Sequence, residues 1–590
     1  MVSSGNEISP SNRAGDAGHK DKKEFPCDVR AAFRRPRSVS EVAEWDLNAK
    51  WFGVSPLVLM ENAGAAVAQV VREQRPKARR VAVFAGSGGN GGDGLVAARH
   101  LSAWAEVDVY LCAFPDRLRP EDVRVNWELI RNSPFVRTHV CPRAEDAREI
   151  ARRLEAEEAY DVAVDALLGA GSRGEPREPV RTAVEVIRDQ KRRGAFVVSV
   201  DLPSGYPGAW RVEADLAVTF AWDKDVYERD SFPRVVVPIG YPLDVAFRAG
   251  PADVQALVAH PWTRKGERGS VFVLGGSVRY PGAPLLAARA AHLLVDLVTV
   301  SVFAEAPNFA VPHELIPLRL PGKRFARDHL PALEETLRRA RAVVVGPGLG
   351  RHPETIYALR RLWLILAERG IPVVVDADAL LAWSRPRSPK ETSPKAHLRP
   401  FPAVLTPHAG EFRRLAALLG FSSQVYPARG EGAFSTPPRA GEAVEAGESY
   451  TAQGEDVFST PPLVAEACTV RELARRARAV VIRKGPVDVV AASDRWAYNT
   501  TGNPGMTTAG TGDILAGLVG GFLARGAAQG LLSIPEEDGE ALAFRAAKAA
   551  AFVNGLAGEI AASERGGPWY TAEDVLRSLP AALRRAAEFA

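Results

Sequence analysis

The chain has 590 residues, of which 46% are apolar and 25% charged, and its 75 basic residues nearly balance its 71 acidic ones. One hydrophobic core rarely serves so long a chain, so we expect several domains. The net charge of +4 makes no case for binding nucleic acid or an anionic membrane, and charged residues interrupt the longest apolar stretch, 283–303, which excludes a membrane span.

The first 38 residues are polar, rich in glycine, serine and lysine, and without hydrophobic periodicity, so we expect residues 1–38 to be a disordered tail. The start has no apolar segment of a secretory signal, and the four cysteines lack metal-ligand spacing. Both observations favour a cytoplasmic location with free thiols.

Two helices follow the tail, and the second carries Glu61 and Asn62 inside an apolar run. Polar side chains in such a run need partners or a ligand unless they face solvent. A compact apolar strand is predicted over 80–85, followed by the glycine-rich stretch 86–94 and a helix over 95–104. This order of elements is the geometry that receives a phosphate, although the glycine spacing is not the dinucleotide fingerprint.

The pattern also predicts strands over 107–113, 161–165 and 195–200, and helices near 144–157 and over 179–192. Ligands bind at the carboxyl ends of parallel strands, so we expect Asn90, Asp165, Asp201 and Ser204 to converge there. Hard oxygen atoms of this kind suit a hard cation, and Asn90 and Asp93 could also hold a ribose or a nicotinamide. Each aspartate alone would serve equally well as a helix or turn cap.

Strands over 216–220 and 235–238 complete the first unit, and residues 248–262 are expected to be a linker. A second α/β unit is predicted over 263–590, with strands over 270–274, 299–303, 342–345, 373–376, 403–405, 480–482 and 487–491. The sequence Phe-Ser-Thr-Pro-Pro occurs twice within 421–462, and this stretch is expected to be a surface insertion.

The most informative stretch is 499–517, in which four glycines precede an apolar helix. Gly510, Thr511 and Gly512 lie where backbone N–H groups and the helix dipole both favour an anion, most simply a phosphoryl group. Asp513, in the first turn of that helix, can act as a base, which suits phosphoryl transfer to a hydroxyl. The alternative is a glycine-rich turn that Asp513 merely caps.

Two other strand ends of the second unit carry polar groups. Lys484 follows the strand over 480–482 and could meet nucleotide phosphates. His408 follows the strand over 403–405 and lies beside Glu411. Such a histidine either caps a helix or contacts a ligand, and its place at a strand end favours the ligand.

Residues 503–513, Asn-Pro-Gly-Met-Thr-Thr-Ala-Gly-Thr-Gly-Asp, resemble the signature of the NAD(P)H-hydrate dehydratases, a branch of the ribokinase-like fold. This resemblance runs from about residue 263 to the end. Met-Glu-Asn-Ala-Gly, Asn-Gly-Gly-Asp-Gly, Asp-Ala-Leu-Leu-Gly-Ala-Gly and Asp-Leu-Pro-Ser-Gly occur in the order found in the NAD(P)H-hydrate epimerases, over about residues 40–247. The two resemblances imply an α/β protein of two three-layer αβα domains. A Rossmann-like epimerase domain would occupy 39–247 and a ribokinase-like dehydratase domain 263–590.

For the first domain, the resemblance implies that two stretches bind the hydrated nicotinamide nucleotide: Gly89, Asn90, Gly91, Gly92 and Asp93, and then Gly169, Ala170, Gly171, Ser172, Arg173, Gly174 and Glu175. It also implies that Asn90, Asp165 and Ser204 hold a potassium ion and that Asp201 is catalytic. The family usually has asparagine where this chain has Gly89, so that side-chain contact is absent here.

For the second domain, the resemblance implies substrate contacts from Ala283, Gly348, His408 and Asp513, with Asp513 as the catalytic base. It implies that the nucleotide is bound, with Mg²⁺, by Lys484, Gly485, Pro486, Val487, Asp488, Gly510, Thr511 and Gly512. The family often has threonine where this chain has Asp488, so a carboxylate replaces that hydroxyl.

Together the resemblances imply repair of NADH and NADPH that have been hydrated at C6 of the nicotinamide ring. The first domain would interconvert the R and S epimers, and the second would dehydrate the S epimer with ADP or ATP, ADP being typical of fused microbial members. The expected partners are the hydrates, the nucleotide and further copies of the chain in a homo-oligomer. Two alternatives are a ribokinase-like kinase of a small vitamin precursor and a nucleotide-binding scaffold with one or both sites inactive.

Overall fold

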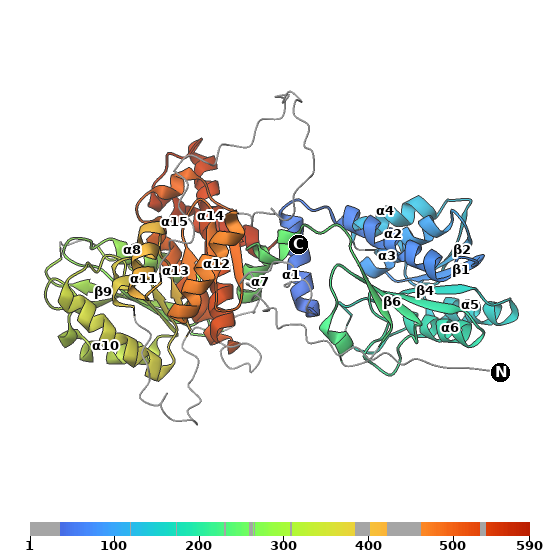
Figure 1. Ribbon diagram of the computed structural model, residues 1–590, viewed down its shortest axis with the longest axis horizontal. Coiled ribbons are helices and arrows are strands. Elements are labelled where there is room, and N and C mark those ends of the chain that lie inside the picture. Colours follow the sequence, from blue (N-terminus) through green and yellow to red (C-terminus); the bar gives the residue numbers. More distant parts are fainter. Residues whose placement is uncertain are drawn as a thin grey trace, which may run out of the picture.

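The computed structural model describes residues 36–118, 120–172, 174–228, 232–258, 264, 266–306, 310–383, 402–421, 462–531 and 539–589. These residues form two α/β lobes that lie side by side along the long axis of the molecule (Figure 1). Most of the predicted tail, residues 1–35, and most of the predicted insertion, residues 422–461, lie outside the described residues.

The first lobe is built on a sheet of parallel strands in the order β3-β2-β1-β4-β5-β6-β7. The strands are β1 (Arg80–Ala85), β2 (Glu106–Leu111), β3 (Val136–Val140), β4 (Val162–Ala166), β5 (Phe196–Val200), β6 (Leu216–Phe220) and β7 (Arg234–Val237). The helices are α2 (Pro56–Gln74), α3 (Gly89–Leu101), α4 (Glu121–Ile130), α5 (Ala144–Ala156) and α6 (Val180–Arg192).

Helices cover both faces of this sheet, which explains why its central strands are apolar without alternation. Val81 and Val83 of β1 belong to the core under α2, α3 and α4. Ala82 and Phe84 point the other way, into the core under α5 and α6. The first lobe is therefore a three-layer αβα domain.

The second lobe has the strand order β10-β9-β8-β11-β12-β13-β14-β15-β16, parallel from β10 to β14 and antiparallel beyond. The strands are β8 (Ser270–Leu274), β9 (Leu297–Phe303), β10 (Ile316–Leu320), β11 (Ala342–Val345), β12 (Val373–Val375), β13 (Ala403–Leu405), β14 (Val480–Arg483), β15 (Asp488–Ala491) and β16 (Trp496–Asn499). The longer helices are α8 (Ala283–His292), α10 (Pro353–Arg369), α11 (Ala409–Leu418), α12 (Pro462–Ala477), α13 (Thr511–Ala528), α14 (Gly539–Arg565) and α15 (Ala572–Ala587).

The second sheet is also sandwiched between helices. Val344 of β11 packs under α8, α13 and α14, and its neighbour Val345 packs under α10, α11 and α12. Helix α13 lies so close to α8 that a Cβ atom at Gly517 would be 2.1 Å from the carbonyl oxygen of Ala287. The predicted fold class, two three-layer α/β domains, is thus confirmed.

Two predicted boundaries need correction. Residues 248–262, expected to be a linker, contain helix α7 (Pro251–Val258), which packs on α14 and α15. The buried guanidinium of Arg525 donates hydrogen bonds to the carbonyl oxygens of Leu257 and Val258 and so caps α7 from the second lobe. At the other boundary, Arg37 is only 4% exposed and bridges to Lys224, so the ordered chain begins before residue 39.

Helix α1 (Val39–Trp51) lies between the two lobes (Figure 1). Trp45 packs edge-on against Trp222 of the first lobe at 4.7 Å between ring centroids. On another face, Glu44 forms a 2.7 Å ion pair with Arg545 of α14, and Trp51 packs edge-on against Phe552 at 5.4 Å. One helix therefore belongs to both lobes.

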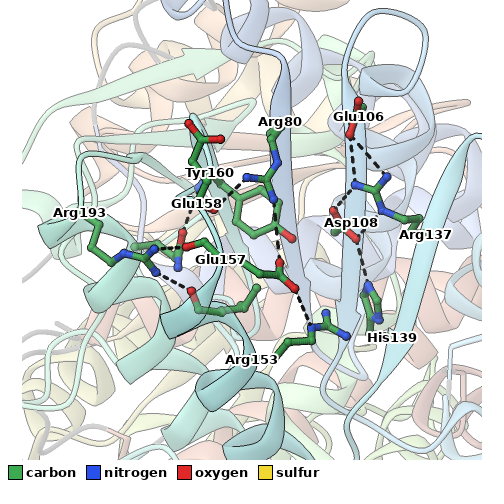
Figure 2. Close-up of polar contacts among 12 residues, drawn as sticks. Arg80, Glu106, Asp108, Arg137, His139, Arg153, Glu157, Glu158, Tyr160 and Arg193 are labelled. Atoms are coloured by element: carbon green, nitrogen blue, oxygen red, sulfur yellow. Dashed lines mark hydrogen bonds and ion pairs between the residues drawn. The ribbon is translucent and has the colours of Figure 1, made fainter.

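A polar network runs over β1, β2 and β3 of the first lobe (Figure 2). Arg137 donates to both carboxylate oxygens of the buried Asp108, at 2.9 and 2.7 Å, and Nε2 of His139 lies 3.0 Å from the same carboxylate. These hydrogen bonds outweigh burial and lower the pKa of Asp108 far below its ordinary value.

Candidate active sites

The first lobe has an open cavity of about 820 Å³ at the carboxyl ends of its central strands. Its wall includes Gly89, Asn90 and Asp93 at the start of α3, residues 167–172 after β4, and Asp201 after β5. Because β1, β4 and β5 are neighbours in the sheet, the loops that follow them meet at one edge.

Asp165 anchors this edge from the end of β4. Its fully buried carboxylate accepts hydrogen bonds from Ser199 Oγ and the Ser204 backbone N–H, both at 2.8 Å, and from Ser204 Oγ. Burial raises the pKa of Asp165, although the hydrogen bonds from the serines oppose it. Ser204 Oγ also accepts from the Leu168 N–H at 2.8 Å, and Asn90 Nδ2 donates to the Leu168 carbonyl oxygen at 3.1 Å. The structure thus brings Asn90, Asp165 and Ser204 together.

Asp201 lies beside this cluster, in a left-handed backbone conformation with φ of +64°. Its carboxylate pairs with Lys224 Nζ and lies 3.3 Å from the Ala170 N–H, while Tyr227 donates its hydroxyl to the Asp201 carbonyl oxygen. A strained, non-glycine residue held by three partners is typical of a functional position. Lys224 also donates to Thr219 Oγ1 at 3.0 Å, which fixes its ammonium beside Asp201.

The glycine-rich stretch is not the expected loop, because α3 already begins at Gly89. A Cβ at Gly91 would lie 2.0 Å from the Gly86 oxygen, and one at Gly92 would lie 2.5 Å from Met60 Cε. These two glycines allow the helix to pack closely and do not line the cavity, unlike Gly89, Asn90 and Asp93. Burial, followed by the negative charge of Asp201, raises the pKa of Asp93 well above its ordinary value.

The second stretch that was predicted to bind the substrate, residues 169–175, also lines the cavity only in part. Gly169, Ala170, Gly171 and Ser172 line the cavity, whereas Arg173 lies outside the described residues. Gly174 is exposed, and Glu175 accepts hydrogen bonds from the Ala209 and Trp210 N–H groups at 3.2 and 3.3 Å. Glu175 therefore holds the loop after β5 instead of facing the cavity.

The polar pair inside the apolar helix has protein partners. Glu61 pairs with Arg99 and with His100, and Asn62 donates to the Ile239 carbonyl oxygen at 2.9 Å. The motif Met-Glu-Asn-Ala-Gly thus fastens α2 to α3 and to the segment after β7.

Sequence reasoning missed several residues of the cavity. Asp46 and Lys50 reach it from α1, and Lys224 and Tyr241 reach it from the segments after β6 and β7. Lys224 could have been found, because it follows a strand of the same parallel sheet. Asp46 had no such signal, since its helix precedes the first strand by about thirty residues in a region without glycine motifs.

The second site lies at the N-terminus of α13. Gly510, in a left-handed conformation with φ of +101°, is the N-cap residue, and no side chain caps α13. The Thr511 N–H donates to the Thr508 carbonyl oxygen at 3.4 Å, and the dipole at this end of the helix favours an anion. Burial and the nearby carboxylate of Asp376 raise the pKa of Asp513 to about 7, against the opposing effect of Lys484. Asp513 can therefore gain or lose a proton near neutral pH.

Lys484 connects this helix end to the neighbouring strand ends. Its Nζ lies 2.9 Å from Asp376 Oδ1, and a Cβ at Gly512 would lie 3.3 Å from the same Nζ. Burial alone would lower the pKa of Lys484, but the carboxylates of Asp376 and Glu411 raise it overall. The lysine is thus held as a cation beside the N-terminus of α13.

The loop after β14 is closed by Asp488, which accepts from the Gly485 N–H at 3.1 Å and from Asn499 Nδ2 at 3.3 Å. Gly485 and Pro486 are exposed, and Val487 packs against the core. The His408 side chain is 55% exposed and caps α11, because its Nδ1 accepts a hydrogen bond from the Gly410 N–H at 3.0 Å. The backbone N–H of His408 donates to the Glu411 carboxylate. The capping role that sequence reasoning ranked second is therefore present.

The predicted pair Ala283 and Gly348 also meets. A Cβ at Gly348, where φ is +73°, would lie 3.3 Å from Ala283 Cβ and 2.5 Å from the Tyr280 carbonyl oxygen. Ser277 Oγ donates to the Gly348 carbonyl oxygen at 2.7 Å. The loops after β8 and β11 thus pack together at the start of α8.

Across the described residues, no group of three or more His, Cys, Asp or Glu side chains is placed to hold a metal ion. The oxygen atoms of Asn90, Leu168, Ser204 and Asp165 are of a different type, one hard carboxylate with neutral oxygens, which fits a hard cation, monovalent or divalent. Mg²⁺ commonly binds one or two carboxylates together with substrate phosphates, and Asp376 and Glu411 offer such carboxylates near α13. Among the described helices, none is long and apolar enough to cross a membrane.

One parallel and one mostly parallel sheet, each with acidic and basic side chains gathered at the carboxyl ends of its parallel strands, define a two-domain α/β protein with two candidate ligand sites. Two family models match it: YjeF-related protein N-terminus over residues 56–226, and NAD(P)H-hydrate dehydratase over 271–429 and 463–581. The second match is interrupted within the predicted insertion.

The chain is 35% identical to the bifunctional NAD(P)H-hydrate repair enzyme Nnr of Methanothermobacter thermautotrophicus, over 92% of this chain and 94% of the relative. It is 36% identical to the protein of the same name from Pyrobaculum aerophilum, over 92% and 96%. The chain belongs to the family of bifunctional NAD(P)H-hydrate repair enzymes, as its motifs predicted.

Among solved structures, the ADP/ATP-dependent NAD(P)H-hydrate dehydratase from Bacillus subtilis, co-crystallized with ATP/Mg²⁺, is 21% identical and matches 57% of this chain and 98% of its own. Its TM-score against this chain is 0.40.

Proposed function

We propose that this chain interconverts the R and S hydrates of NADH and NADPH in its first domain and dehydrates the S hydrate in its second, at the expense of ADP or ATP. The observation that carries the proposal is Asp513, whose pKa is raised to about 7 at the N-terminus of α13, beside the Lys484 cation. A base, a cation and a helix N-terminus at one point suit phosphoryl transfer to a hydroxyl.

In the second domain, Asp513 takes the proton of the C6 hydroxyl, and the hydroxyl oxygen attacks the terminal phosphorus of the nucleotide. The bond from that phosphorus to the bridging oxygen breaks, and the shortened nucleotide leaves. Lys484 and the N–H groups of the first turn of α13 offset the charge on the transferring group. The C–O bond then breaks with the help of the ring nitrogen lone pair, inorganic phosphate leaves, and loss of a proton from the adjacent ring carbon gives NADH or NADPH.

For the nucleotide, we assign Lys484, Gly485, Pro486, Val487, Asp488, Gly510, Thr511 and Gly512, and for the substrate Ala283, Gly348, His408 and Asp513. Asp488 contributes by closing the turn under the nucleotide, since its carboxylate already accepts two hydrogen bonds. Asp376 and Glu411 would hold Mg²⁺, which supplies positive charge to the phosphates. ADP is the proposed nucleotide.

In the first domain, we assign substrate binding to Gly89, Asn90, Asp93, Gly169, Ala170, Gly171, Ser172 and Asp201. Asn90, Asp165, Ser204 and the Leu168 carbonyl oxygen would hold K⁺, which supplies positive charge near the bound nucleotide. Asp201 moves the proton that epimerisation requires, and Lys224 holds it in place. We further propose that the protein is cytoplasmic and forms a homo-oligomer, and size measurement in solution tests the oligomer.

The test uses a mixture of R and S NADH hydrate with ADP or ATP, and follows recovery of nicotinamide absorbance. Wild-type protein should recover the whole mixture. Asp201→Asn should recover only the S share. Asp513→Asn should recover no absorbance but should still interconvert the epimers, which chromatography that separates the R and S hydrates would show. No recovery by wild type with either nucleotide would reject the proposal. A stable phosphorylated product from a vitamin precursor would instead establish the kinase alternative.

A further inference from the structure

We propose that Asp46 of helix α1 is a second acid–base residue of the first site, working from a different wall of the cavity than Asp201. This inference rests on the proposed epimerisation. Asp46 lies outside the segment that the N-terminal family model matches, which begins at residue 56.

The geometry places Asp46 where it can meet the ligand. Val42, Asp46 and Lys50, at helical spacing on α1, line the same cavity as Asn90 and Asp201. The other faces of α1 pack against Trp222 and the second lobe, so this face is committed to the cavity. Asp46 from α1 and Asp201 from the end of β5 both line this cavity, and the Asp46 side chain is exposed.

The charges around Asp46 separate its role from that of Asp201. Lys224 is in direct contact with Asp201 and Thr219, whereas its positive charge acts on Asp46 only at longer range. Asp46 is open to the cavity, yet the protein around its carboxylate desolvates it and raises its pKa to about 7, with Lys224 lowering the pKa and Asp201 raising it further. The other charged groups of the cavity are Lys50 on α1 itself, Asp93 on α3 and Asp122 on α4. Two carboxyl groups in one cavity, one with a lysine in contact and one without, are suited to opposite roles in proton transfer.

Epimerisation at C6 needs both roles. One residue donates a proton to the C6 hydroxyl oxygen, the C–O bond breaks, and water leaves a ring cation stabilised by the ring nitrogen. Water then adds to the opposite face of the ring, forming a new C–O bond, and a second residue takes the proton that this water loses. No proton is gained or lost overall. Because the two events occur on opposite faces, groups on two walls of the cavity serve them better than one.

The test measures interconversion of purified S and R hydrate by the full-length protein without nucleotide, over pH 5 to 9 (about two units either side of the midpoint near 7). Asp46→Asn should lower the maximal rate by ~10² to 10⁴-fold, the usual contribution of one acid–base residue, with little change in the substrate concentration at half-maximal rate. It should also remove the limb of the pH profile near 7. Asp46→Glu should restore part of the rate together with the limb.

The matched control is Glu44→Gln, which removes a carboxylate from the same helix on the face that meets Arg545. Dehydration of S hydrate with ADP should be unchanged in Asp46→Asn, which shows that the second lobe is intact, and the thermal unfolding of the variant should match that of wild type, which reports on the first lobe. The inference is overturned if Asp46→Asn keeps its rate within about twofold, or if it slows while the limb near pH 7 persists, as a purely structural role would predict. Absence of interconversion by wild type would instead overturn the proposed function.

Discussion

The protonation of Asp513 makes the second site sensitive to pH, and its effect can be worked out from the structure. The carboxyl group must be ionised to accept the hydroxyl proton, and its pKa is raised to about 7. At pH 7 about half of the molecules then carry the base form, and at pH 6 about one in eleven does. The rate of dehydration per unit of enzyme at low substrate should therefore fall about tenfold for each pH unit below 6 and level off above 8.

The neighbours of Asp513 predict the direction in which this midpoint moves. The Asp376 carboxylate raises the pKa of Asp513 after burial does, so Asp376→Asn should move the midpoint to lower pH. Asp513→Asn should leave no pH-dependent limb and should lose ~10² to 10⁴-fold in rate. The assay is recovery of NADH absorbance from S hydrate with saturating ADP, with protein integrity checked by thermal unfolding at each pH.

A dehydration rate that is flat from pH 5.5 to 8 would refute the assignment of Asp513 as base, as would a midpoint near the ordinary aspartate pKa of 3.8. A midpoint that fails to move in Asp376→Asn would refute the electrostatic account but leave the base in place. The two results therefore separate the identity of the base from the cause of its pKa.

Three other outcomes follow from contacts far from Asp513. Asp108→Asn should lower the free energy of unfolding at pH 7, measured by urea titration, by about 2 kcal/mol. This value is kept low because Arg137, the partner in the ion pair, is half exposed and solvent screens the pair. The Asp108 pKa is lower in the folded state, so this stability exists above the unfolded pKa and should fade as pH falls through the folded value, where both proteins should become equally stable. If the site binds K⁺, the unfolding temperature of wild type should be higher in K⁺ than in Na⁺, and Asp165→Ala should lose this difference. The same difference in wild type and in Asp165→Ala would contradict the K⁺ site. Trp51→Ala should lower the free energy of unfolding by about 3 kcal/mol, because it removes the contact of Trp51 with Phe552. An unfolding temperature in calorimetry equal to that of wild type would contradict this packing.

The sequence was a sound guide to the central strands. The apolar runs over 270–274, 342–345 and 403–405 coincide with β8, β11 and β13, because strands buried on both faces leave a continuous hydrophobic signal. The edge strands β3 and β10 escaped prediction, since each has a single buried residue and no clear period. Edge strands contact solvent on one side, so selection for apolar side chains is weak there.

The candidate sites were predictable where motifs follow strands. Asn90, Asp165, Asp201 and Ser204 converge as the parallel topology requires, and the N-terminus of α13 lies beside Lys484. Glycine was misleading in one respect, because its low helix propensity predicted a loop where α3 begins. Packing against Met60 outweighs that propensity, and the same glycines that weaken the helix make its close approach possible.

Helix α1 bears on how the molecule can be divided. An engineer who cuts the chain between residues 226 and 271, where the two family matches end and begin, would leave Trp51 and its neighbours without Phe552 to cover them. A cut after residue 54 would instead strip the first cavity of one wall. Each half would expose surface that the other covers, so we expect separately produced halves to bind each other or to precipitate.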